Sequence, residues 1–131
     1  MRIQSLLLGA AALIALSTPM AFAEDYAGGA IKTMDGPKGA YLTDAKGMTL
    51  YIYDKDTKGV SNCYDTCAEK WPPLMAGADA KAEGDFNIVD RTDGSKMWAY
   101  KGMPLYLWVN DKKPGDLTGD GVGKVWHTAL E

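Results

Sequence analysis

The sequence contains an internal duplication. Residues 31–76 align with residues 86–131 at a constant offset of 55 positions and without a gap. Eleven of the forty-six aligned pairs are identical, against roughly three expected from average composition. The similarity is strongest between residues 46–56 and residues 101–111. A duplication of this length favours one small domain built from two equivalent halves.

The repeated stretch predicts a β-strand in each copy. In the first copy Leu50 and Ile52 alternate with Tyr51 and Tyr53, so the aliphatic and the aromatic side chains fall on opposite faces. Glycine-containing turns separate shorter apolar runs on either side. The predicted strands span residues 31–34, 41–43, 48–53, 86–89, 96–100 and 104–108. The sequence therefore predicts an all-β domain made of two pseudo-equivalent antiparallel β-meander repeats.

A short helix is predicted only in the first copy. Ser61 or Asn62 would cap it, it would cover residues 63–70, and the prolines that follow would end it. Cys63 and Cys67 are the only cysteines, and on one helical turn their Cα atoms would lie about 6 Å apart, within the disulfide range. We therefore expect a disulfide that pins this helix.

The second copy predicts a different ending. Glycines within residues 114–121 disfavour a helix there. A strand over residues 122–128 would then carry Trp126 to the position that Trp71 holds in the first copy. Small residues over 75–84 predict a linker between the copies.

Residues 1–23 have the composition of a secretory signal, with the basic Arg2, an apolar run and a small-residue cleavage site. The apolar run is shorter than the about 20 residues that a membrane span needs. We expect a single domain over residues 24–131 that begins with a flexible lead-in at 24–30. The expected location is periplasmic or secreted, without membrane insertion, and disulfides persist in such compartments.

The charge balance bears on the class of partner. The chain has 17 acidic and 14 basic side chains, a net charge of −3 at pH 7. Nucleic acids and anionic membranes attract basic surfaces. We therefore expect no nucleic-acid partner, and the sequence carries no signal for an oligomeric state.

Both copies carry the pattern Tyr-x-aromatic-x-x-Asp. The motif residues are Tyr51, Tyr53, Asp56, Tyr106, Trp108 and Asp111. The chain resembles a family of bacterial secreted and lipid-anchored proteins that is described as a secreted repeat of unknown function and named for this motif. The segments 46–48, 63–68, 71–74, 101–106 and 114–116 are similar to the family too. Many relatives carry a lipid-attachment cysteine after the signal, which this sequence lacks. The resemblance implies an exported envelope protein and implies no activity, because the family has no established one.

Asp56 and Asp111 are the first candidates for chemistry. A two-fold pseudo-symmetry could bring them together as a carboxylate pair that shares a proton and acts as acid and base. A structural role is the simpler interpretation. An aspartate after a strand commonly accepts N–H bonds from the next turn, and a buried tyrosine such as Tyr51 or Tyr106 can tie its hydroxyl there. We predict the structural role for the whole repeat motif.

The aromatic residues are candidates for binding. A platform that stacks on a flat or sugar-like ligand or on a partner protein could be formed by Tyr51, Tyr53, Tyr106 and Trp108, with Trp71, Trp98 and Trp126 near them. The alternative is that the rings form half of a core that is covered on both faces of the strand. The segments that the copies do not share hold the candidate binding surface, which consists of Trp71, Pro72, Pro73, Trp126 and His127.

A copper or redox site is an alternative. Cys63 and Cys67, with a methionine or His127, could bind copper(I), which prefers sulfur ligands. The candidate methionines are Met48, Met97 and Met103. Methionine on an aliphatic strand face is commonly core filler, and the cysteines lack the spacing of thioredoxin-like and haem-attachment motifs. We therefore predict no metal site and no cofactor.

The chain offers few groups for nucleophilic catalysis. After residue 23 the only serines are Ser61 and Ser95, and His127 is the only histidine, so a nucleophile paired with a base has little support. We predict a non-catalytic binding or interaction module whose partner is an envelope protein or a small ligand. The alternative function is a periplasmic redox or copper-handling protein.

Overall fold

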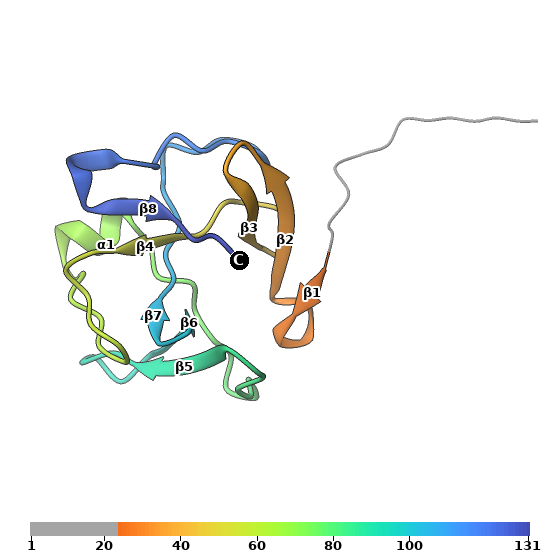
Figure 1. Ribbon diagram of the computed structural model, residues 1–131. Helices are drawn as coiled ribbons and strands as arrows, with labels where there is room; N and C mark the ends of the chain where they lie inside the picture. Colours follow the sequence, from red (N-terminus) through yellow and green to blue (C-terminus); the bar gives the residue numbers. More distant parts are fainter. Residues whose placement is uncertain (1–23) are drawn as a thin grey trace, which may run out of the picture.

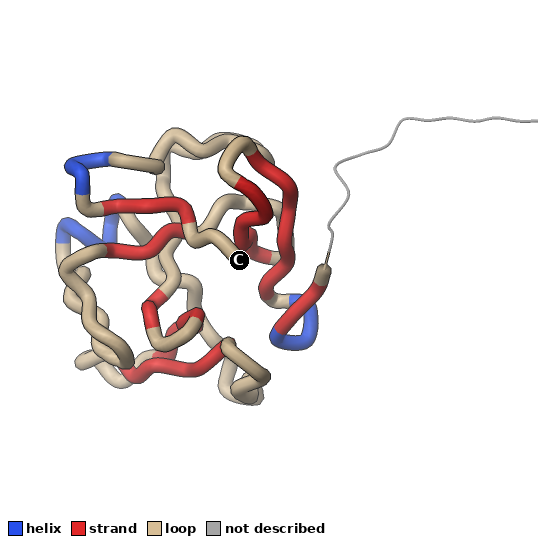
Figure 2. The backbone as a smooth tube through the Cα atoms, in the orientation of Figure 1, coloured by secondary structure: helices blue, strands red, loops and turns tan. Residues whose placement is uncertain are grey.

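The computed structural model describes residues 24–131, so the predicted signal segment lies outside the described residues. Figure 1 shows that the strands of this part form three small sheets, and Figure 2 shows that long loops connect them. The elements are β1 (Asp25–Tyr26), η1 (Ala27–Gly29), β2 (Ile31–Gly36), β3 (Gly39–Asp44), β4 (Tyr51–Tyr53), α1 (Thr66–Lys70), β5 (Phe86–Asp90), β6 (Lys96–Tyr100), β7 (Met103–Pro104), η2 (Val122–Lys124) and β8 (Trp126–Thr128). The all-β prediction with two repeats and one short helix is confirmed.

The first repeat begins with the predicted antiparallel hairpin. The sheet has the order β1-β2-β3, and the β2–β3 pairing runs from Ile31 opposite Asp44 to Gly36 opposite Gly39. Only two residues remain for the loop at this end. Such a short loop fixes the register of the hairpin.

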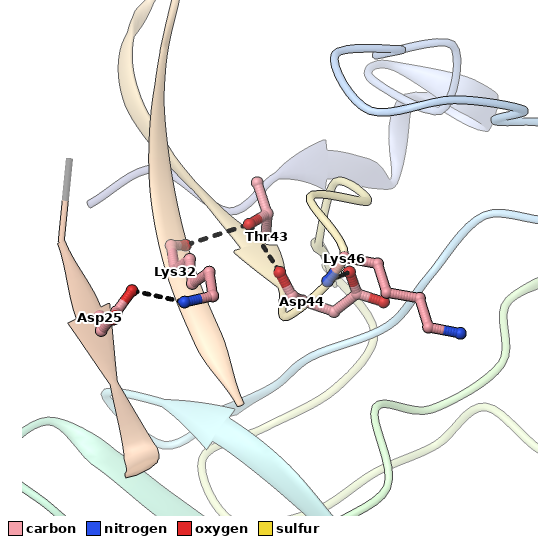
Figure 3. A network of polar contacts seen from close by, with 5 residues as sticks. All are labelled: Asp25, Lys32, Thr43, Asp44 and Lys46. Atoms are coloured by element: carbon pink, nitrogen blue, oxygen red, sulfur yellow. Dashed lines mark hydrogen bonds and ion pairs between the residues drawn. The ribbon is translucent and has the colours of Figure 1, made fainter. Parts of the chain in front are cut away.

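Side-chain hydrogen bonds build the turn after β3. The Asp44 carboxylate accepts the backbone N–H groups of Lys46 and Met48, each at 2.9 Å. Figure 3 shows this turn together with the ion pair between Lys32 and Asp25, which joins β2 to β1 with 2.7 Å between Nζ and Oδ1. The turn directs the chain from β3 toward the central strand β4.

The second repeat forms the sheet β5-β6-β7, in which β5 and β6 are the counterparts of β2 and β3. Its first hairpin closes at Asp90 opposite Lys96, so this loop is longer than the one between β2 and β3. Its second turn is tighter, because Lys101 and Gly102 have φ angles of 52° and 87°, the left-handed geometry of a two-residue hairpin loop.

Because the turns differ in length, the offset between equivalent residues of the two copies is 56 between the two turns and 55 before and after them. Thr43 pairs with Thr49 in the first repeat, whereas Ala99 pairs with Pro104 in the second. Thr49 and Pro104 obey the offset of 55 positions, but Thr43 and Ala99 are 56 apart. The gapless alignment is therefore one residue out of register at β3 and β6.

The two repeats exchange their last segments. The central strand β4 of the first repeat pairs with β8 of the second, with Tyr53 opposite Trp126. Reciprocally, Leu107 of the second repeat donates its backbone N–H to the Pro72 carbonyl of the first at 2.8 Å. Neither copy closes its own sheet, so the two repeats fold as one intertwined unit.

The core divides as the alternation predicts. The fully buried Leu50 and Leu105 lie in a mainly aliphatic cluster that also contains Ile31, Phe86 and Trp98. The fully buried Tyr51 and Tyr106 lie in a separate, mainly aromatic cluster. Residues 48–53 and 103–108, which we call the central strands, thus contribute alternate side chains to the two clusters, and the regular strands within them are β4 and β7.

The helix is shorter than predicted. It covers Thr66–Lys70, and the residue before it, Asp65, makes no side-chain cap bond. Ser61 is buried and bonds to other side chains, while Asn62 donates its side-chain amide to the Lys55 carbonyl. Neither is therefore placed to cap a helix.

Two further expectations are wrong. The predicted strand over 122–128 begins only at Trp126, because Gly123 and Lys124 have φ angles of 60° and 62° and form a 3₁₀ turn. The predicted flexible lead-in is ordered, because β1 pairs with β2 and the ring of Tyr26 packs on Phe86. Among the described residues no helix is long and apolar enough to cross a membrane.

The exchange of terminal segments predicts that neither half folds alone. A peptide of residues 24–80 lacks β8, and a peptide of residues 81–131 lacks the segment that pairs with its own central strand. We expect each peptide to give the NMR spectrum of an unfolded chain and an equimolar mixture to give the dispersed spectrum of the intact domain. A single peptide that is dispersed and monomeric by ultracentrifugation would contradict the exchange.

Candidate functional site

Four aromatic rings form a continuous stack through the core. Trp71 and Trp126 stack on each other with centroids 3.8 Å apart and planes 2° apart. Tyr53 stacks on Trp126 at 4.2 Å, and Trp108 stacks on Trp71 at 4.0 Å. The stack Tyr53–Trp126–Trp71–Trp108 therefore joins the two repeats across their pseudo-two-fold axis, with equivalent residues at equivalent positions.

Burial differs along this aromatic stack. The inner rings Trp71 and Trp126 are each 4% exposed, whereas the end rings Tyr53 and Trp108 are half-buried. Most of the ring surface of the stack is therefore part of the core, as in the interpretation in which both faces of the strand are covered. A binding platform would be limited to the exposed parts of the Tyr53 and Trp108 rings.

The structure separates the residues of the candidate binding surface. Trp71 and Trp126 are buried in the stack, so their ring faces are not available to a partner. Pro72 and Pro73 are half-buried beside the central strand of the second repeat, and His127 is half-buried in β8. These three residues do not form a shared surface with the two tryptophans.

The repeat motif forms two reciprocal hydrogen bonds between the copies. Tyr51 donates its hydroxyl to Oδ2 of Asp111 at 2.6 Å, and Tyr106 donates its hydroxyl to Oδ2 of Asp56 at 2.6 Å. All four residues are buried, with 5% exposure for Asp56 and 7% for Asp111. Each tyrosine also meets a stacked tryptophan edge-on, Tyr51 at Trp71 and Tyr106 at Trp126.

A buried arginine joins the hydrogen-bond network of the Tyr106–Asp56 pair. Arg91 donates to Ser61 Oγ at 2.9 Å, and Ser61 Oγ lies 2.6 Å from the Tyr106 hydroxyl. Because arginine only donates, the protons point in one direction along Arg91, Ser61, Tyr106 and Asp56. The second Asp56 oxygen accepts the backbone N–H of Asn62 at 2.7 Å.

The pair around Asp111 has different neighbours. Thr118 donates its backbone N–H and its hydroxyl to Oδ1 of Asp111, at 3.0 and 2.6 Å. The Gly119 N–H donates to the Tyr51 hydroxyl at 3.1 Å. A Cβ atom at Gly119 would lie 2.8 Å from Cη2 of Trp71 and 2.9 Å from Cζ of Tyr51, so a larger residue does not fit without movement.

Burial sets the protonation of these groups. It raises the pKa of Asp56, against the opposing effects of the Tyr106 hydroxyl, the Asn62 N–H and the charge of Arg91. Burial and the hydrogen bond to a carboxylate raise the pKa of both Tyr51 and Tyr106 far above the ordinary value. Both tyrosines therefore keep their protons at neutral pH and act as donors.

This geometry does not favour an acid–base pair. In the described part of the chain no hydrogen bond joins the carboxylates of Asp56 and Asp111, and each carboxylate is held by a different tyrosine and a different turn. Two carboxylates that share one proton would have to contact each other.

The residues considered for copper are engaged elsewhere. Cys63 and Cys67 form the expected disulfide, with Cα atoms 5.2 Å apart. His127 Nε2 lies 2.8 Å from Oδ2 of Asp54. Over residues 24–131 no three His, Cys, Asp or Glu side chains cluster closely enough to hold a metal.

Sequence reasoning missed Arg91. Its guanidinium is buried, donates to the Cys63 carbonyl at 2.8 Å and lies 4.2 Å from the centroid of the Tyr64 ring. One signal was available, because Arg91 is the only arginine after residue 23 in a chain that otherwise uses lysine. Arginine suits buried sites with several acceptors better than lysine does.

A second site lies away from the aromatic stack. A groove of about 480 Å³ is lined by Tyr26, Glu83, Gly84, Asp85, Phe86, Tyr100 and Glu131, which come from β1, the linker, β5, β6 and the last residue in the sequence (Figure 1). Its three aromatic rings form a row, with centroids 4.7 Å apart between the first two and 5.0 Å between the last two. We call this the aromatic–acidic groove.

Carboxylates surround the aromatic rings of this groove. Glu83 accepts the Ala27 N–H at 2.6 Å. The Tyr26 hydroxyl lies 2.5 Å from a carboxylate oxygen of Glu24 and 2.5 Å from one of Glu131. A hydrogen bond from this hydroxyl favours the charged form of a carboxylate, and it lowers the pKa of Glu24, so negative charge remains at the rim.

Double-mutant cycles should detect the reciprocal pairing. Tyr51→Phe removes the donor to Oδ2 of the buried Asp111 and the acceptor of the Gly119 N–H, so we expect the unfolding free energy to fall by about 1–3 kcal/mol. Combined with Asp111→Asn, it should show a coupling energy above about 0.5 kcal/mol in urea unfolding. The matched cycle of Tyr51→Phe with Asp56→Asn should be close to additive. Coupling in the second cycle and additivity in the first would instead indicate that each tyrosine bonds to the aspartate of its own repeat.

The raised pKa of Asp56 predicts a pH dependence with a definite sign. The native state binds this proton more tightly than the unfolded state, whose pKa is ordinary, so the contribution of Asp56 to stability falls as pH rises from the ordinary to the raised pKa. We expect Asp56→Asn to remove this fall in urea unfolding measured between about pH 3 and pH 7.

Asp120→Asn is the matched control for this measurement. The Thr128 N–H and Lys38 lower the pKa of Asp120, so its stabilisation is present above the ordinary pKa and is lost as pH falls. The two variants should therefore change the pH profile in opposite directions. A parallel change in both would contradict the assignment for Asp56.

One of the comparisons with known proteins gives a match. The model of a family described as a secreted repeat of unknown function matches residues 32–75 and again residues 87–130. No curated protein and no solved structure gives a significant match. The two matched segments follow the two halves of the intertwined fold. The chain belongs to this family of secreted repeats of unknown function.

Proposed function

We propose that the protein is a non-catalytic binding module, in the periplasm or outside the cell, that captures a cationic group in the aromatic–acidic groove. The ligand would be an amine or guanidinium, carried by a small molecule or by a basic side chain of an envelope protein. The observation that carries the proposal is the groove of about 480 Å³, in which the rings of Tyr26 and Tyr100 flank the buried Phe86, with acidic residues and no basic residue among those that line it.

Both the aromatic rings and the carboxylates of the groove attract cations. An aromatic ring face attracts a positive charge within about 6 Å of its centroid, and the chain already uses one of these rings in that way, because Lys101 Nζ lies 5.1 Å from the centroid of Tyr100. The side chains of Glu83, Asp85 and Glu131 add negative charge along the lining. Aromatic walls with carboxylates suit an alkylammonium better than a neutral or anionic ligand.

The groove has no counterpart at the equivalent position of the first repeat. Phe86 corresponds to Ile31 in the other copy, and Tyr100 corresponds to Asp44 in the pairing of the strands. The first repeat therefore has no equivalent row of aromatic rings. A feature that occurs in both copies can be explained by folding alone. The groove occurs once, so it supports a specific function better.

A titration with a model cation tests the proposal. We expect Nα-acetyl-lysine methylamide to bind saturably and to shift NMR signals of Tyr26, Phe86 and Tyr100. The norleucine analogue, which lacks the amine, should not bind. The combined variant Glu83→Gln and Asp85→Asn should weaken binding severalfold and keep the fold, since glutamine can still accept the Ala27 N–H.

Glu69→Gln is the matched control, because Glu69 is an exposed acid on α1 and does not line the groove. It should leave the affinity unchanged. Equal weakening by the control, or shifts spread over all acidic surfaces, would indicate general electrostatic attraction and would contradict the proposal. Equal binding of the norleucine analogue would contradict it as well.

A further inference from the structure

The aromatic stack offers a continuous path between two places on the surface. Its rings are in contact at centroid distances of 3.8–4.2 Å from Tyr53 through Trp126 and Trp71 to Trp108. The two inner rings are shielded from water, and the two end rings are half-buried. Tryptophan and tyrosine are the side chains that lose one electron most readily apart from thiolates, and stacked rings can share the resulting hole.

Each inner tryptophan also contacts a tyrosine that is equipped to release a proton. Tyr51 lies edge-on to Trp71 with 5.3 Å between centroids, and Tyr106 lies edge-on to Trp126 at 5.2 Å. Oxidation of a tyrosine is favourable only if its hydroxyl proton leaves together with the electron. Here each hydroxyl is hydrogen-bonded at 2.6 Å to a buried carboxylate that can take the proton.

We propose that the stack and the two tyrosine–aspartate pairs form a relay that accepts an oxidising equivalent at the surface and holds it on a buried tyrosine. A small oxidising radical derived from peroxide removes one electron from Trp108 at an end of the stack and is reduced to its anion. The hole then moves along the stack to Trp71 or Trp126.

The last step conserves atoms and charge within the protein. An electron passes from Tyr51 or Tyr106 to the adjacent tryptophan radical cation, which becomes neutral tryptophan. The O–H bond of the tyrosine breaks, and the proton forms an O–H bond on Asp111 or Asp56. The product is a neutral tyrosyl radical beside a carboxylic acid. One electron from a small reductant of the ascorbate class and return of the same proton restore the starting state.

The surroundings of Asp56 and Asp111 suit this proton transfer. Both carboxylates are less than a tenth exposed, so the transferred proton stays next to the tyrosine instead of escaping to water. Burial raises the pKa of Asp56, which makes its carboxylate a better proton acceptor. Further donors hold the pairs in place, Ser61 at Tyr106 and Gly119 at Tyr51.

Flash photo-oxidation of the intact domain tests the relay. Ruthenium tris-bipyridine with a cobalt(III) quencher generates a one-electron oxidant in solution when illuminated. We expect transient absorption to show a tryptophan radical first and a tyrosyl radical next, with the second step slower in D₂O because the proton moves with the electron. The double variant Tyr51→Phe with Tyr106→Phe should lose the tyrosyl signal and keep the tryptophan radical.

Two variants separate this role from simple packing. Asp56→Asn with Asp111→Asn keeps both tyrosines but offers them an amide, which does not take the proton, so the tyrosyl radical should be lost there too. Tyr41→Phe is the matched control, because Tyr41 is buried outside the stack, and it should behave as the unmodified protein does. A tyrosyl signal that survives both double variants would overturn the relay.

Isotope labelling of the unmodified protein decides the question even where a double variant does not fold. Ring deuteration of tyrosine should narrow the electron paramagnetic resonance spectrum of the trapped radical, and exchange into D₂O should remove a coupling to the hydrogen-bonded proton. A trapped radical that is tryptophanyl only, or that has no exchangeable proton coupling, would overturn the relay. Neither result depends on the aromatic–acidic groove.

Discussion

The two hydrogen bonds that cross the pseudo-two-fold axis, from Tyr51 to Asp111 and from Tyr106 to Asp56, determine how the repeats fit together. Apolar contact is not directional, so the aliphatic and aromatic clusters would tolerate several arrangements of the two halves. A buried hydroxyl or carboxylate left without its partner costs about 1–3 kcal/mol. A shift of either central strand by one residue would break both bonds and move every side chain to the other face.

This constraint explains why the two copies agree at some positions and differ at others. Tyrosine and aspartate are needed in both copies, because each tyrosine serves the aspartate of the other repeat. The end rings of the stack have only to be flat and apolar on one side, and they are Tyr53 in one copy and Trp108 in the other. The residues that complete each carboxylate differ more, with Asn62 on one side and Thr118 on the other.

Local patterns in the sequence predicted the paired hairpin strands β2, β3, β5 and β6 and the division of the core, because alternation along one strand determines which side chains share a face. They did not predict β1 or the late start of β8. The exchange of β8 was not predictable in this way. Trp71 and Trp126 have the same spacing from their central strands whether each pairs with its own repeat or with the other. The ends of the helix were misjudged because Ser61, which looks like a cap, is used by Tyr106 and Arg91.

Some features occur in both repeats and others occur once, and this difference distinguishes the features that folding requires from those that it does not. The stack and the tyrosine–aspartate pairs obey the pseudo-symmetry and hold the repeats together, so a chemical role there would be added to a structural one. The aromatic–acidic groove has no such symmetry and combines residues from the lead-in, the linker and the second repeat. Phe86 and Tyr26 pack on each other there, yet the fold of the first repeat does without an equivalent pair. Stability alone therefore accounts for the stack more readily than for the groove, and for this reason we assign binding to the groove.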